Sequence, residues 1–174
     1  MSYIKKQPLF IVTGASCVGK SAACNILFQN EKDYIVMESD LLWNNVYNTP
    51  DDNYCGYRRL WMRVAANISQ AGKPVILCGC AVPEQFEPHP ERDCFTEIHY
   101  LAVVCNAIQM EQRIRNGRQI TDENWIKSSL DFNKWLVDNA QNTHPSIKLV
   151  DNSDITPGET AEAIDCWIKE KMQA

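Results

Sequence analysis

The stretch of sequence that decides the fold is residues 9–21, LFIVTGASCVGKS. Its first five residues are apolar or β-branched, which predicts a strand buried on both faces, as in parallel sheets. Residues 14–21 match the pattern G-x-x-x-x-G-K-[S/T] at every fixed position. A helix is expected to follow from about Lys20 to Asn30. A strand, a glycine-rich turn and a helix therefore follow one another directly, which predicts the opening of an α/β sheet.

The fixed residues of this motif each have a physical role in binding a nucleoside triphosphate. Gly14 and Gly19 permit backbone angles that turn successive N–H groups toward phosphate oxygens, and the helix adds the positive end of its dipole. Lys20 is expected to reach the β- and γ-phosphates, and the Ser21 hydroxyl to coordinate Mg²⁺. Chance occurrence of the motif is on the order of 10⁻³. The predicted phosphate-binding residues are Gly14, Ala15, Ser16, Cys17, Val18, Gly19, Lys20 and Ser21.

Beyond the motif, short β-rich runs alternate with longer helical periods. Further strands are expected at residues 34–37, 74–78, 98–105 and 147–150. The side chain of Asn106 suits a helix N-cap, and residues 156–159, TPGE, form a capping box. Five strands separated by helices predict a layered α/β domain with right-handed crossovers. The polar, turn-rich stretches 48–56 and 83–93 are expected to be functional loops that carry acceptor specificity.

The composition is that of a globular protein. Of 174 residues, 45% are hydrophobic and 22% are charged, which suits one domain over residues 1–174 and argues against a disordered chain. Seventeen basic and twenty-two acidic residues give a net charge of −5, which argues against nucleic acid or an anionic membrane as partner. Eight cysteines without zinc-site spacing, and no recognisable export signal, predict free thiols in the cytoplasm. Both a monomer and a homodimer are compatible with the sequence.

Two classes of nucleotide-binding protein fit the sequence less well. A GTPase would carry N-K-x-D, but Asn133-Lys134 is followed by Leu136 at the last position. A hydrolytic ATPase usually carries an acidic residue at the end of a second core strand, and the strand ending at Cys78 has none.

Nearly the whole chain resembles the small P-loop metabolite kinases, such as shikimate kinase, gluconate kinase, chloramphenicol phosphotransferases and nucleoside or nucleotide kinases. The resemblance rests on the motif, on Glu38-Ser39-Asp40, on Gly79 and on the arginine-rich segment 113–118. It implies a three-layer P-loop fold, a parallel sheet of strand order 2-3-1-4-5, and an arginine-rich lid at about 113–123. It also implies ATP- and Mg²⁺-dependent phosphoryl transfer to a metabolite hydroxyl. Nucleoside or nucleotide acceptors, or a non-catalytic regulatory ATP- or GTP-binding protein, are the alternatives.

The resemblance also implies roles for the residues after the second strand. Asp40 would align the acceptor hydroxyl or accept its proton, and Glu38 would support a magnesium-bound water. The alternative for Asp40 is that it caps a helix over residues 41–47. Trp43 is expected to pack in the core. The alternative is that it resembles the tryptophan with which nucleoside kinases stack on the acceptor base.

Basic residues complete the implied site. Arg59 and Arg63 lie one helical turn apart and could grip an acceptor anion, or form a solvated face. Arg118 would stabilise the transferring phosphoryl group, while Arg113 would lie against adenine. Asn152 follows the fifth strand, where these kinases wrap backbone around adenine. Gly79 is assigned to the acceptor side.

Overall fold

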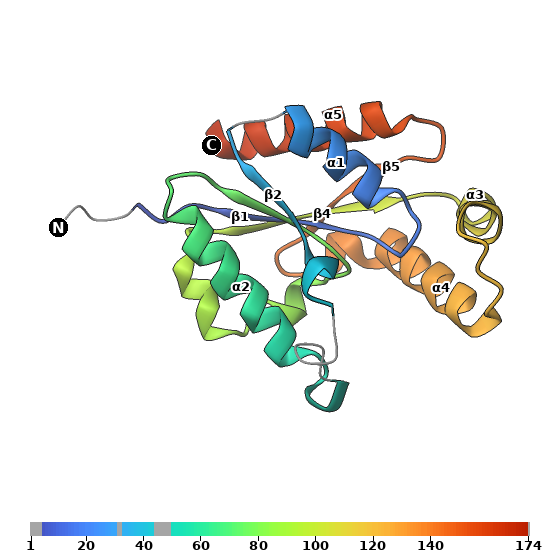
Figure 1. Cartoon of the computed structure of the whole chain (residues 1–174), viewed down its shortest axis with the longest axis horizontal. Coiled ribbons are helices and arrows are strands. Elements are labelled where there is room, and N and C mark those ends of the chain that lie inside the picture. The colour runs from blue at the N-terminus through green and yellow to red at the C-terminus, as the bar shows by residue number, and fades with distance from the viewer. Residues whose placement is uncertain (1–4, 31–32, 44–49, 174) are drawn as a thin grey trace.

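A computed structural model describes residues 5–30, 33–43 and 50–173, and its centre is a five-stranded sheet. All strands are parallel and lie in the order β2-β3-β1-β4-β5, as predicted (Figure 1). In register, Leu9 of β1 lies between Val75 of β3 and Ile98 of β4. The strands are β1 (Leu9–Thr13), β2 (Ile35–Glu38), β3 (Val75–Cys78), β4 (Ile98–Val104) and β5 (Ile147–Asp151).

Helices cover both faces of this sheet and complete three layers. Figure 1 shows α1 and α5 on one face, with α2 and α4 on the other. The predicted three-layer P-loop fold is therefore present. The helices are α1 (Lys20–Asn30), α2 (Cys55–Ser69), α3 (Ala107–Gln112), α4 (Glu123–Asn139) and α5 (Pro157–Gln173). Among the described residues, no helix is long and apolar enough to cross a membrane.

The apolar residues of the central strand alternate between the two layers. Phe10 and Val12 belong to the core beneath α1 and α5, whereas Leu9 and Ile11 belong to the core beneath α2 and α4. All four side chains are buried. Successive side chains of a strand point to opposite faces of the sheet, so a strand that is apolar at successive positions suits a sheet covered on both faces. This burial on both faces holds β1 in place, and the phosphate motif begins at the carboxyl end of the strand.

The predicted helix signals are present where the sequence places them. The Asn106 side chain accepts a hydrogen bond from the Gln109 N–H at 2.9 Å and caps α3. Before α5, the Thr156 N–H donates to Glu159 at 2.7 Å, and the Glu159 N–H donates back to Thr156 Oγ1 at 3.2 Å. This reciprocal pair is a capping box.

The alternative for Asp40, that it caps a helix over residues 41–47, does not hold within the described part of the chain. Instead a 3₁₀ helix spans Ser39–Leu42, with Glu38 as its N-cap and Trp43 as its C-cap. Asp40 lies inside this short helix, so the capping alternative for its carboxylate does not hold. Residues 44–49 lie outside the described part of the chain.

Candidate active site

The phosphate motif bends sharply as it leaves β1. Gly14 has φ 148° and Gly19 has φ 112°, angles that residues with a Cβ rarely adopt. A Cβ on Gly14 would also lie 2.5 Å from the Val103 carbonyl oxygen of β4. The two glycines are therefore required by backbone geometry, as the motif predicts.

Lys20 is more enclosed than a lysine in a solvent-facing loop would be. Only 8% of its surface is exposed. Its ammonium donates to the Gly14 carbonyl at 2.7 Å and to the Ala15 carbonyl at 2.8 Å. The motif thus folds around its own lysine and holds this positive charge at the carboxyl end of β1.

A cavity of about 260 Å³, which we call the phosphate cavity, opens beside this lysine. It brings together five residues that the sequence predicts to act in phosphoryl transfer, although they come from three separate segments. These five are Lys20, Ser21, Glu38, Asp40 and Arg118. Further lining residues are Ser16, Cys17, Cys78, Gly79, Cys80, Ile120 and Trp125.

The oxygen atoms that face the phosphate cavity suit Mg²⁺. Ser21 supplies a hydroxyl, and Glu38 and Asp40 supply carboxylates that make no hydrogen bond or ion pair with any described residue. Within residues 5–30, 33–43 and 50–173, no group of three or more His, Cys, Asp or Glu side chains could hold a metal ion unaided. Magnesium usually takes one or two protein ligands, with phosphate oxygens and waters as the rest. The residues present therefore fit a magnesium ion that arrives with a triphosphate.

Arg113 and Asn152 brace the phosphate motif from outside. The Arg113 guanidinium and the Asn152 amide both donate to the Val18 carbonyl, each at 2.8 Å. Arg113 also donates to Asn152 Oδ1 at 2.9 Å, and Asn152 is buried. Arg113 lines a further hollow over Gly19 and Arg118. The predicted adenine contacts of Arg113 and Asn152 stay predictions, whereas their contact with the motif is a feature that the sequence did not indicate.

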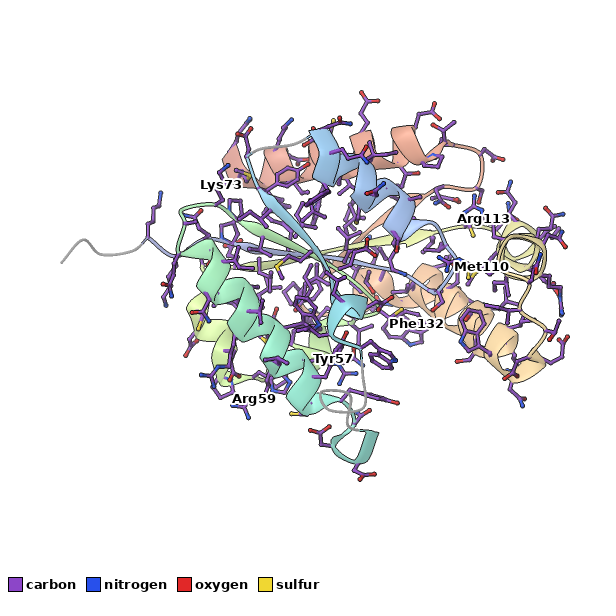
Figure 2. The ribbon with its side chains drawn as sticks, in the orientation of Figure 1. Tyr57, Arg59, Lys73, Met110, Arg113 and Phe132 are labelled. Atoms are coloured by element: carbon purple, nitrogen blue, oxygen red, sulfur yellow. The ribbon has the colours of Figure 1, made fainter. Side chains whose placement is uncertain are left out.

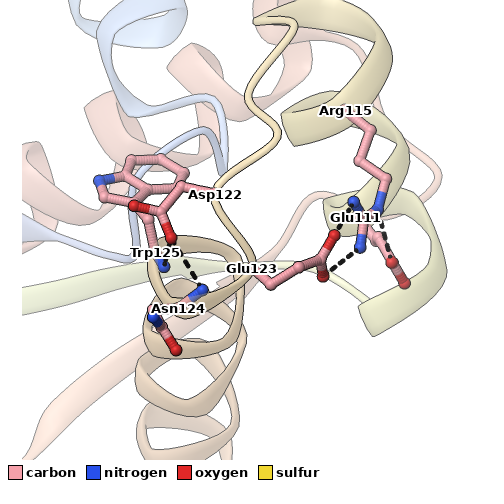
Figure 3. A network of polar contacts seen from close by, with 6 residues as sticks. All are labelled: Glu111, Arg115, Asp122, Glu123, Asn124 and Trp125. Carbon is pink, nitrogen blue, oxygen red and sulfur yellow. Dashed lines mark hydrogen bonds and ion pairs between the residues drawn. The ribbon is translucent and has the colours of Figure 1, made fainter.

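The three arginines of the predicted lid differ in their partners. Arg115 is held by two carboxylates, at 2.8 Å from Glu111 and 2.7 Å from Glu123 (Figure 3). Asp122 caps α4 in the same network by accepting from the N–H groups of residues 124 and 125. Arg118, in contrast, lines the phosphate cavity, and none of the described residues forms an ion pair with it. The charge of Arg115 is therefore paired within the protein, whereas Arg118 faces the phosphate cavity without a carboxylate partner among the described residues.

A second cavity, of about 310 Å³, lies on the other side of Gly79 and Cys80. We call it the aromatic cavity, because aromatic side chains from several segments form much of its lining. Both Gly79 and Cys80 line the two cavities. The aromatic side chains are Trp43, Tyr54, Tyr57, Trp61, Phe86 and Phe132.

The wall between the two cavities is held to β1 by one backbone hydrogen bond and one from a side-chain hydroxyl. The Gly79 N–H donates to the Val12 carbonyl at 3.1 Å, and the Thr13 hydroxyl donates to the Ala81 carbonyl at 2.6 Å. A Cβ on Gly79 would lie 2.2 Å from Ser39 Oγ. Glycine is thus needed here for close approach of the segment that carries Asp40.

The predicted anion-binding arginines lie elsewhere. Arg59 forms a two-pronged ion pair with Glu91 at 2.9 and 3.0 Å, and Figure 2 shows it at the outer surface of α2. Neither Arg59 nor Arg63 is among the lining residues of the two cavities, so their acceptor role stays a prediction without geometric support. The Glu91 carboxylate has its pKa lowered by the hydrogen bond from Arg59. The arginine that does line the aromatic cavity is Arg58, which no sequence signal distinguishes from Arg59 and Arg63.

Comparisons with solved structures give the same fold. No protein-family model matches the sequence, and a search of curated proteins gives no match. A tunicamycin resistance protein from Deinococcus radiodurans aligns with a TM-score of 0.66 at 12% identity, over 94% of this chain and 96% of that one. A gluconokinase from Sinorhizobium meliloti 1021 aligns with a TM-score of 0.59 at 12% identity, over 91% and 90%. Shikimate kinase from Aquifex aeolicus aligns with a TM-score of 0.55 at 15% identity, over 95% and 99%. At these identities the likeness concerns the fold.

Proposed function

We propose that this chain is a kinase that transfers the γ-phosphoryl group of ATP, with Mg²⁺, to a hydroxyl group of a small molecule. The observation that carries the proposal is the pair of cavities that meet at Gly79 and Cys80. One cavity has the charges that a triphosphate and a metal need, and the other can hold an acceptor beside it. Kinases among the structures of similar fold support the same activity.

The chain's own residues would divide the work of transfer. Backbone N–H groups of the motif and the Lys20 ammonium bind the phosphates, while Arg118 offsets the charge that spreads over the transferring group. Magnesium, when bound with the nucleotide, would neutralise charge on the β- and γ-phosphate oxygens. Asp40 orients the acceptor hydroxyl and accepts its proton.

ATP is favoured over GTP by the position of Asn133. This residue would begin an N-K-x-D guanine motif, but it lies within α4 and is buried. Its amide donates to the Cys105 carbonyl at 2.8 Å, and its Oδ1 accepts from the Cys105 N–H at 3.2 Å. Both polar ends of the side chain therefore hold α4 to the end of β4.

The experiment that tests the proposal is Asp40→Asn. The carboxylate is exposed and makes no hydrogen bond with a described residue, so the free energy of unfolding should change by less than about 0.5 kcal/mol. Transfer to the acceptor should fall by about 10²-fold or more, because asparagine cannot accept the proton. ATP affinity, measured by calorimetry, should stay near wild type.

Asp33→Asn is the matched control, since Asp33 is exposed, lines neither cavity and lies outside both predicted acceptor loops. It should leave both transfer and ATP affinity unchanged. Equal transfer by the Asp40→Asn variant and the wild type would refute the role of Asp40. A regulatory nucleotide-binding protein would instead bind ATP and show no acceptor-dependent turnover in either variant.

A further inference from the structure

The aromatic cavity is lined largely by aromatic and apolar side chains. The Tyr57 hydroxyl and the Trp61 indole N–H both donate to one backbone carbonyl, that of Ser39, the indole at 3.0 Å. Their polar ends are therefore used within the protein. Trp43 packs edge-on against Tyr57, with ring centres 5.2 Å apart, and in a tilted arrangement against Tyr54 at 5.5 Å. Trp43, Tyr54 and Tyr57 thus form one continuous aromatic patch in the lining.

Two polar side chains of the lining, Arg58 and Gln85, are also engaged within the protein. Arg58 donates to the Asn53 carbonyl at 2.6 Å, and its guanidinium lies 5.9 Å from the centre of the Tyr54 ring. Gln85 Oε1 accepts from the Val82 N–H at 3.2 Å. A sugar acid or other polyol buried here would lose hydrogen bonds to water without a matching set of partners. Each hydroxyl left unpaired in this way is strongly unfavourable.

A flat ring, in contrast, matches this surface. Aromatic pairs gain from stacked and edge contacts beyond the burial of their area. Tyr57 and Phe132 both lie on the side of the sheet that α2 and α4 cover (Figure 2). The cavity volume of about 310 Å³ is at the small end of ligand sites. It suits one compact ring system.

We propose that the acceptor is an alcohol that carries an aromatic ring, held in the aromatic cavity with its hydroxyl directed past Gly79 toward Asp40. This inference rests on the proposed kinase function and names its substrate class. Arg58 is the one cation among the described lining residues, so neutral or anionic rings are preferred to cationic ones. Trp43, which is 52% exposed, would close over the ring and become buried by it.

The experiment uses the full chain with MgATP and two sets of probe alcohols. The ring-bearing probes are 4-nitrobenzyl alcohol, 2-phenylethanol and uridine, and the ring-free probes are gluconate, shikimate and glycerol. Phosphorylated product is measured by mass spectrometry, and binding by calorimetry with a non-hydrolysable ATP analogue present. At least one ring-bearing probe should be phosphorylated with kcat/KM about 10²-fold above every ring-free probe.

Trp43→Ala should raise the KM for that probe by about 10-fold and change kcat by less than about 3-fold. Tyr54→Asn is a second variant, since Tyr54 has φ 59° and asparagine tolerates that angle. It should act in the same direction. Phe28→Ala removes a similarly exposed aromatic ring from α1, outside both cavities, and should leave KM unchanged.

The remaining outcomes separate this inference from the proposed function. If gluconate, shikimate or glycerol were phosphorylated in preference to the ring-bearing probes, the inferred substrate class would be wrong, and the proposed kinase function would stand. If ring-bearing probes bound in a way that depended on Trp43 but no alcohol was phosphorylated, ring binding in the aromatic cavity would be supported. The proposed kinase function would then be wrong. The inference would be overturned if no ring-bearing probe bound to the protein and none was phosphorylated.

Discussion

The phosphate cavity and the aromatic cavity share a wall but are built in different ways. In the phosphate cavity, Lys20 bonds carbonyls only five and six residues earlier. In the aromatic cavity, Trp61 bonds Ser39 across 22 residues, and Phe132 arrives from another helix. The phosphate-binding loop is made by local backbone angles and can be recognised in a short motif, whereas a cavity lined by packed rings from several segments requires the fold.

The largest effect is expected at the phosphate cavity, from Lys20→Ala. Loss of the ammonium removes the point charge on the β- and γ-phosphates, so phosphoryl transfer should fall by about 10³-fold. The variant should also lose about 1–2 kcal/mol of unfolding free energy, because two carbonyls lose a buried donor. Lys127→Ala, on the exposed side of α4, is the control and should retain full activity. Normal transfer by the Lys20 variant would show that the phosphate motif takes no part in phosphoryl transfer.

A bulky group on the shared wall should affect both cavities at once. The Cys80 thiol is exposed, lies 3.2 Å from the Gly14 carbonyl and 4.0 Å from the Lys20 ammonium, and lines both cavities. Alkylation by N-ethylmaleimide should lower transfer by at least about 10-fold, with bound ATP giving protection. Burial raises the pKa of the nearby Cys17 thiol, so Cys17 should react more slowly.

The reacted thiols can be identified by peptide mass spectrometry. Cys94 and Cys166 are also exposed but line neither cavity, so their labelling should not track the loss of transfer. A Cys80→Ala variant should keep its own untreated rate after exposure to the reagent. Complete labelling of Cys80 with no loss of transfer would show that the wall is not shared by donor and acceptor.

The sequence predicts the fold better than it predicts the acceptor site. Strand positions follow from apolar runs, helix ends from Asn106 and from Thr156 with Glu159, and the phosphate loop from its glycines. These are local signals, and the structure confirms them.

Which arginine lines the acceptor cavity depends on which face of α2 turns toward that cavity. Arg58, Arg59 and Arg63 are indistinguishable by residue type, yet Arg58 lines the aromatic cavity and Arg59 pairs with Glu91. Trp43 is half exposed and not part of the core. The aromatic residues of the cavity could not be grouped from the sequence. They lie in separate segments of the chain, and only the fold brings these segments together.

A smaller effect should follow from Asn152→Ala, which weakens the brace of the phosphate motif. The variant loses the donor to the Val18 carbonyl at 2.8 Å and the acceptor for Arg113 at 2.9 Å. ATP affinity should fall by about 10-fold, and unfolding free energy by about 1–3 kcal/mol. Calorimetry and urea unfolding measure the two quantities, with exposed Asn67→Ala as the control. Unchanged ATP affinity would show that the brace serves stability alone.

The smallest effect is expected far from both cavities, at His99. Its ring stacks on Phe10 at 5.2 Å, and burial lowers its pKa, although Glu97 at 3.2 Å acts in the opposite direction. The imidazole therefore stabilises the fold fully above the unfolded pKa of about 6.5, and this contribution is lost as pH falls through the lowered pKa. In His99→Phe, unfolding free energy should fall less between pH 7.5 and 5.5, as urea unfolding would measure. The same decrease in variant and wild type would contradict this assignment.

The most direct test of the two-cavity account follows the γ-phosphoryl group itself. The full chain is incubated with Mg²⁺, with ATP labelled in the γ-phosphate, and with the ring-bearing and ring-free alcohols. The account predicts that the label moves to an alcohol, with one phosphorylated alcohol formed for each ADP. Label released only as inorganic phosphate, at a rate that no alcohol changes, would contradict the claim that the two cavities are the donor and acceptor halves of one kinase site.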